Sequence, residues 1–157
     1  MKIAKLKIVH RGQEELLHSW PTRTCGFHLK IKMVRPIVMM AEIEPPEGLS
    51  ARKLVLETGK YNVITAYSLK EALETLAIFP KVHAVVLHAS LCKERDCDQV
   101  IGEIKQRHPG MTVIALSPVS AHAFKSADYN ISSHEPQQLL NLLRERFGDP
   151  RTPAEKP

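Results

Sequence analysis

"YNVITAYSLKEALETLAIFP", residues 61–80, reads as a strand followed by a helix and is the clearest indication of the fold class. Its first seven residues are rich in β-branched and aromatic side chains, which favour a strand. Ser68 and Glu71 follow in the spacing of a capping box, and Pro80 ends the helical pattern. The apolar residues expected on one helical face are Leu69, Ala72, Leu73, Leu76 and Ala77. The stretch therefore predicts one complete strand–helix unit.

The same alternation repeats on both sides of this unit. Further strands are predicted at 36–41, 82–88, 111–116 and 127–132. Further helices are predicted at 49–59, at 98–108 and from Pro136 onward. In the first of these helices, Ser50 lies near the start and Gly59 is expected to supply a left-handed stop. Strands alternating with helices at this spacing predict a three-layer, doubly wound α/β domain with a five-stranded parallel sheet.

Two of these helices carry a clear apolar face. The inward positions are expected to be Val100, Ile101, Ile104, Leu139, Leu140, Leu143 and Phe147. In doubly wound folds, ligands gather at the carboxyl ends of the strands. The search for a site therefore narrows to the loops after Ala41, Leu87, Leu116 and Ile131.

Composition sets the class of protein. A chain of 157 residues that is 43% hydrophobic suits one domain with a proper core. No run approaches the roughly 20 apolar residues of a membrane helix, and no apolar signal core opens the chain, so we expect no membrane association. Three cysteines, Cys25, Cys92 and Cys97, are an odd number at low density. We expect free thiols and a cytoplasmic location.

The net charge of +5 is concentrated at one end. Residues 1–35 hold 8 basic and 2 acidic groups, a net of +6, and the other 122 residues hold 14 basic and 15 acidic groups, a net of −1. We expect residues 1–34 to be a disordered basic extension or a mis-assigned start, with Met33 as the true first residue. A nucleic-acid or membrane-surface arm and an extra docking segment stay open as alternatives. The tail, 149–157, is Pro-rich and charged and is expected to be disordered.

Three stretches together resemble response-regulator receiver domains. "YNVITAYSLKEALETL" is similar to their second strand and helix, "IKQRHPGMTVIALS" to their third helix and fourth strand, and "ADYNISSHEPQQLLNLL" to their fifth strand and last helix. The resemblance covers residues 35–148 and implies a receiver, or flavodoxin-like, fold. Only nine residues separate Ser117 from Ala127, so the fourth helix of a receiver is expected to be short or missing and the usual output face rebuilt. Exposed edges there would favour a partner or a second copy.

The resemblance also assigns functional positions. The acidic pair that holds Mg²⁺ in working receivers falls on Ala41 and Glu42, and the phosphoacceptor aspartate falls on His88. The hydroxyl position is Ser117, and the lysine position is Ser133. Only Glu42 and Ser117 keep the chemistry, so we expect no metal and no other cofactor.

The resemblance therefore implies a degenerate receiver, or pseudo-receiver, in a bacterial two-component type pathway. We expect a non-catalytic, phosphorylation-independent signalling module that is not an enzyme. Its partner would be a kinase, a regulator or a second copy of itself, and nucleic acid would bind only through the basic N-terminal segment. An atypical receiver that uses Glu42 or Glu44 to recruit metal in a phosphorelay is one alternative. A small enzyme or ligand-binding protein on the same scaffold is another.

His88 leaves several roles open. The simplest is a histidine that ends a buried strand and hydrogen-bonds a neighbour. It could instead sense pH or a ligand, or accept phosphate as a nucleophile. A zinc site is a further alternative, because His88, Cys92 and Cys97 follow an H-x3-C-x4-C spacing. Otherwise Asp96 or Asp98 is expected to cap the next helix.

Overall fold

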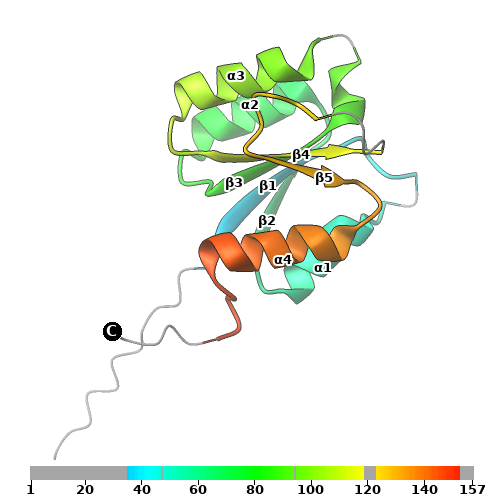
Figure 1. Ribbon diagram of the computed structural model, residues 1–157, viewed down its shortest axis with the longest axis vertical. Helices are drawn as coiled ribbons and strands as arrows, with labels where there is room; N and C mark the ends of the chain where they lie inside the picture. Colours follow the sequence, from blue (N-terminus) through cyan, green and yellow to red (C-terminus); the bar gives the residue numbers. More distant parts are fainter. Residues whose placement is uncertain (1–34, 47, 94, 119–122, 153–157) are drawn as a thin grey trace, which may run out of the picture. The chain divides into compact units, whose positions relative to one another are not determined.

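Five parallel strands lie in the order β2-β1-β3-β4-β5 in the computed structural model (Figure 1), which describes residues 35–46, 48–93, 95–118 and 123–152. The strands are β1 (Ile37–Ala41), β2 (Asn62–Ala66), β3 (Ala84–His88), β4 (Thr112–Ser117) and β5 (Tyr129–Ser132). The helices are α1 (Ala51–Thr58), α2 (Leu69–Ile78), α3 (Cys97–Arg107) and α4 (Pro136–Phe147), with a 3₁₀ turn, η1, at Ala89–Cys92. The predicted doubly wound α/β fold is confirmed. The expected extension at 1–34 and the end of the expected tail, 153–157, lie outside the described residues.

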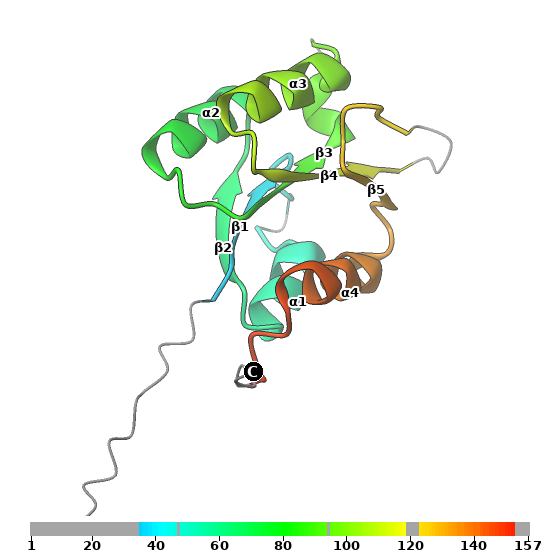
Figure 2. The same ribbon diagram turned by 60° about the vertical axis from the view of Figure 1, so that its left-hand side comes forward.

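The sheet lies between two pairs of helices. In both ribbon views α2 and α3 cover one face and α1 and α4 cover the other (Figures 1 and 2). The strand side chains alternate accordingly: Met39, Val85 and Val113 pack on the α2/α3 side, whereas Met40, Val86 and Ile114 pack on the α1/α4 side. Because both faces are covered, β1, β3 and β4 are almost continuously apolar and buried.

The local signals in the sequence act as expected at most helix ends. The Ser68 hydroxyl accepts a hydrogen bond from the Glu71 amide at 3.1 Å, and the Glu71 carboxylate accepts one from the Tyr67 amide at 2.7 Å. Asp96 caps α3 by accepting from the Asp98 amide at 3.0 Å. The apolar faces are also found, except that Ala77 is exposed.

The expected left-handed stop at Gly59 is wrong. Gly59 has φ −68°, and the left-handed residue is Lys60, with φ 67°. A glycine suits position 59 for a different reason, since a Cβ there would lie 2.7 Å from Cδ1 of Leu140. Close approach of α1 to α4, rather than backbone conformation, explains this residue.

No helix lies between β4 and β5 in the described residues, as the short spacing predicted. Residues 119–122 are not described. Side chains hold the rest of this connection: Asn130 exchanges two hydrogen bonds with the backbone of Phe124, and Asp98 accepts one from the Ser126 amide at 2.7 Å. Within the described ranges, no helix has the length and apolar character that crossing a membrane requires.

Candidate functional site

The strand order places the carboxyl ends of β1 and β3 side by side, at the point where the sheet's winding reverses. Ala41 ends β1, Glu42 follows it, and His88 ends β3. Strand alternation sends Glu42 and His88 to the same face as Met40 and Val86, which is the α1/α4 side. Ser117 ends β4, and the Ser133 amide, just after β5, donates to the Ser117 carbonyl at 2.9 Å. The predicted positions therefore lie along one edge of the sheet.

A residue that sequence reasoning missed, Arg52, connects these positions. Its Nε and Nη2 atoms donate to Oε2 of Glu42 at 2.9 and 2.6 Å, and its Nη1 donates to the Ser133 carbonyl at 3.1 Å. The guanidinium therefore links the acidic-pair position to the lysine position. The Ser50 cap fixes the start of α1 beside this edge, so a long basic side chain in its first turn reaches the buried carboxylate. An arginine in the first turn of the helix after β1 is the signal that could have indicated this pair.

Burial makes the loss of either partner of this ion pair costly. The Glu42 residue is 2% exposed, and the Arg52 side chain is 25% exposed. An arginine in a protein does not lose its proton, so its positive charge at this edge is permanent. The Glu42 Oε1 atom is buried without a hydrogen-bond partner among the described residues. A metal ion would therefore have one carboxylate available, and that carboxylate is already neutralised.

The residues at this edge do not fit Mg²⁺. That ion prefers near-octahedral oxygen ligation with one or two carboxylates besides substrate oxygens. Here Ala41 offers no ligand, His88 offers an imidazole, and Glu42 is bonded to Arg52. In the described part of the chain, no three histidine, cysteine or acidic side chains lie close enough to hold a metal.

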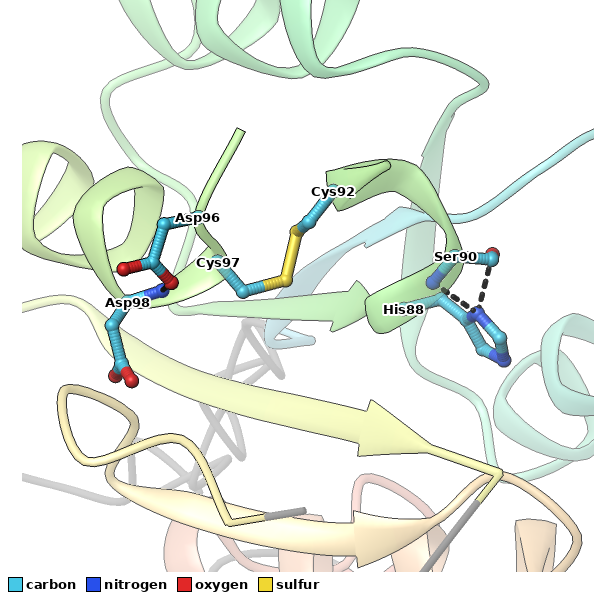
Figure 3. The surroundings of a disulfide bond; sticks show 6 residues. All are labelled: His88, Ser90, Cys92, Asp96, Cys97 and Asp98. Carbon is cyan, nitrogen blue, oxygen red and sulfur yellow. Dashed lines mark hydrogen bonds between the residues drawn. A yellow bond between two sulfur atoms is a disulfide. The ribbon is translucent and has the colours of Figure 1, made fainter. Parts of the chain in front are cut away.

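His88 is held by its neighbour Ser90. Its Nδ1 atom accepts from the Ser90 amide at 3.2 Å and lies 2.6 Å from the Ser90 hydroxyl (Figure 3). Because an amide only donates, Nδ1 serves as an acceptor and the proton of the neutral ring lies on Nε2. Burial lowers the pKa of His88, and the positive charge of Arg52 lowers it further against the opposing effect of Glu42. In this tautomer the Nδ1 lone pair accepts from Ser90 and Nε2 carries the proton.

A disulfide closes the loop after His88. Cys92 at the end of η1 and Cys97 at the start of α3 are bonded, with their Cα atoms 5.3 Å apart (Figure 3). The expectation of free thiols is therefore wrong for these two residues, because η1 turns the chain back within bridging distance of α3. The zinc alternative at His88, Cys92 and Cys97 is wrong for the same reason, since disulfide sulfurs are not thiolate ligands. Cys25 lies outside the described residues.

Solved structures similar to this chain include receiver domains. A CheY-like receiver domain protein from Methanospirillum hungatei JF-1 has 17% identity and a TM-score of 0.59, covering 74% of this chain and 96% of that one. The signal receiver domain of an HD domain-containing protein from Pseudomonas fluorescens Pf-5 has 24% identity and a TM-score of 0.60, covering 71% and 85%. CheY in the CheX–CheY complex with beryllofluoride and Mg²⁺ from Borrelia burgdorferi has 16% identity and a TM-score of 0.60, covering 71% and 89%.

These similarities establish that the chain has the receiver-domain fold. A scan against protein-family models finds no match, and a search of curated proteins finds none either.

Proposed function

We propose that this protein is a receiver-like signalling module that works without phosphorylation, catalyses no reaction and acts through protein–protein contact in a bacterial two-component type pathway. The observation that carries the proposal is the Arg52 guanidinium, which bonds Glu42 and the Ser133 carbonyl. In a receiver, a metal ion and a lysine would neutralise a transferring phosphoryl group at these positions. Here a permanent internal cation occupies that role and is itself neutralised by Glu42.

Charge balance explains why phosphate would gain little at this edge. Phosphoryl transfer depends on positioning and on positive groups that face the transferring oxygens. Arg52 directs three donors to protein acceptors, so its charge is already compensated. Separating it from Glu42 would leave a buried carboxylate unpaired, at a cost of several kcal/mol. The ion pair therefore favours a single, constitutive conformation.

The partner in this proposal is another protein, either a kinase or regulator or a second copy of this chain. Support comes from the Borrelia burgdorferi structure, in which a domain of the same fold is in complex with a second protein, CheX. The proposal includes a cytoplasmic location. The Cys92–Cys97 bridge is the observation against that location, since disulfides are rare there. Alkylation of thiols in acid-quenched cells, followed by mass spectrometry, measures the state of this pair directly.

Exposure to a small-molecule phosphodonor tests the central part of the proposal. The full chain is incubated with acetyl phosphate and Mg²⁺, beside a working receiver domain as the positive control. Intact mass is recorded at neutral to alkaline pH, where phosphohistidine survives. We expect no phosphoryl gain on this protein. A gain that disappears in His88→Asn would overturn the proposal and support the atypical-receiver alternative.

A further inference from the structure

We propose that a groove on the α2 side of the same edge binds an apolar, acidic segment of a partner protein. The inference rests on the proposed protein–protein function and names its docking surface. The groove lies between the residue after Glu42, the start of α2 and the loop that follows β3, and it has a volume of about 590 Å³. Among the described residues, none of β5 or α4 lines it.

The groove offers apolar surface that the fold leaves open. Its apolar lining is Ile43, Tyr67, Leu69, Leu73 and Leu91. Ile43 is 47% exposed and Tyr67 is 37% exposed, although both side chains are large. Ile43 directly follows Glu42 but lines the groove beside Tyr67 and the start of α2, whereas Glu42 is bonded to Arg52 of α1. Gathered apolar surface in a concave site is typical of a place where another molecule binds.

The charged residues that line the groove are all basic: Lys70, Lys93 and Arg95. Lys93 has no ion pair among the described residues, and its neighbour Glu94 lies outside them. Lys70 faces Glu74 at 3.8 Å in a largely exposed pair, which is weak. Arg95 faces Glu103 at 3.1 Å, with side chains that are 47% and 26% exposed. An acidic partner would therefore complement this rim.

Net charge also favours a foreign partner over two other candidate occupants of the groove, the N-terminal segment of this chain and a second copy of the chain. Residues 1–35 of this chain carry a net charge of +6, which opposes binding to a basic rim. Their one acidic run, Glu14-Glu15, stands beside Leu16, Leu17 and Trp20, so a competition experiment with this segment is part of the test below. The rest of the chain has a net charge of −1, which gives a second copy little electrostatic attraction. A segment of another protein with acidic residues beside leucine or aromatic side chains fits both parts of the groove.

The disulfide prepares the groove for binding. Lys93 and Arg95 lie in the loop that the Cys92–Cys97 bridge closes, and Leu91 and Ser90 come directly before it. Asp96 then caps α3 at the end of the same loop. A short covalent loop loses less conformational entropy when a partner orders it, so affinity rises without new contacts.

Selection of peptides on the full chain tests the proposal. Random short peptides displayed on phage are selected for binding to the oxidised protein. The selected peptides are synthesised, and their affinities are measured by fluorescence anisotropy. We expect the selected peptides to combine acidic with leucine or aromatic residues. Ile43→Asp should weaken their binding about tenfold, the loss expected for one buried aliphatic contact. Lys93→Glu together with Arg95→Glu should weaken it by about as much and reduce its salt dependence.

Ile78→Asp is the matched control, because Ile78 is 70% exposed and does not line the groove. It should bind the peptides as the wild type does. Failure to select any peptide, selection of basic peptides, or equal effects of Ile43→Asp and Ile78→Asp would overturn the groove. Displacement of the peptides by a synthetic 1–34 segment would also overturn it. So would self-association of the protein, seen by sedimentation, that displaces the peptides. The phosphodonor assay is independent: phosphate uptake with intact peptide binding rejects the proposed function and leaves the groove.

Discussion

Two neighbouring residues, Glu42 and Ile43, belong to sites with opposite character. Glu42 is buried and ends in a closed network with Arg52, whereas Ile43 is about half exposed in an open groove. Ser90 contributes to both, because it bonds His88 and also lines the groove. At the edge where receivers bind their ligands, the Glu42 carboxylate of this chain is paired with Arg52 through Oε2. Surface and charge for a ligand are left on the other side of the sheet.

The largest expected effect comes from breaking the closed site. Arg52→Met leaves the Glu42 carboxylate buried and unpaired, and should lower the free energy of unfolding by about 3 kcal/mol. Removing both charges in Arg52→Met with Glu42→Leu should restore most of that loss. Urea unfolding measures all of these variants.

Arg107→Met is the matched control, since Arg107 is 59% exposed in its ion pair with Glu103. It should change stability by less than about 1 kcal/mol. If Arg52→Met is as mild as Arg107→Met, then Arg52 is not the internal cation that separates the closed site from the groove.

The next effect links the disulfide to the groove. Reduction of Cys92–Cys97 should lower the free energy of unfolding by about 2 kcal/mol, from the entropy of a loop this short. It should also weaken the groove peptides about threefold, because Lys93 and Arg95 lose their preorganised loop. Urea unfolding and anisotropy, each with and without reductant, measure both changes.

The variant Cys92→Ser with Cys97→Ala controls for the reductant, which should have no effect on it. Peptide binding that is equal in oxidised and reduced wild type would show that the bridge stabilises the fold without shaping the groove.

The smallest effect concerns pH at His88. Its pKa in the folded protein lies below the ordinary 6.5, through burial and then the charge of Arg52. As the pH falls through 6.5, His88 takes up a proton in the unfolded chain before it does so in the folded protein. The stability present above pH 6.5 is therefore lost progressively, and the loss ends once the pH lies below the lower pKa of the folded state. Wild type should therefore lose more stability than His88→Gln between about pH 7.5 and about pH 5.5. Urea unfolding at both values gives this difference, and a larger loss in the variant would contradict the assignment.

The fold was predictable because its signals are local. The β-branched run before Ser68, the capping box and the apolar faces of α3 and α4 each depend on residues close in sequence. The positions Glu42, His88, Ser117 and Ser133 were also predictable, because strand ends fix them along one edge.

The chemistry of that edge was not predictable in the same way. The contact of Arg52 with the Ser133 carbonyl joins residues 81 positions apart, which no periodicity reveals. The Cys92–Cys97 bond depends on how η1 turns, and the role of Gly59 depends on how closely α4 approaches. Composition favoured free thiols and the position of Gly59 favoured a left-handed stop, and tertiary geometry decided otherwise.

An amide NMR titration of the full chain with Mg²⁺ and then beryllofluoride shows whether the edge formed by Glu42, His88, Ser117 and Ser133 binds a phosphate-like ligand. Beryllofluoride mimics a phosphoryl group on a receiver. We predict that the amides of Glu42, His88, Ser117 and Ser133 do not shift at millimolar Mg²⁺ or after beryllofluoride is added, because Arg52 already neutralises Glu42. If these four amides shift together and saturate, the edge still binds phosphate-like ligands, and the account of a closed, phosphorylation-independent site is wrong.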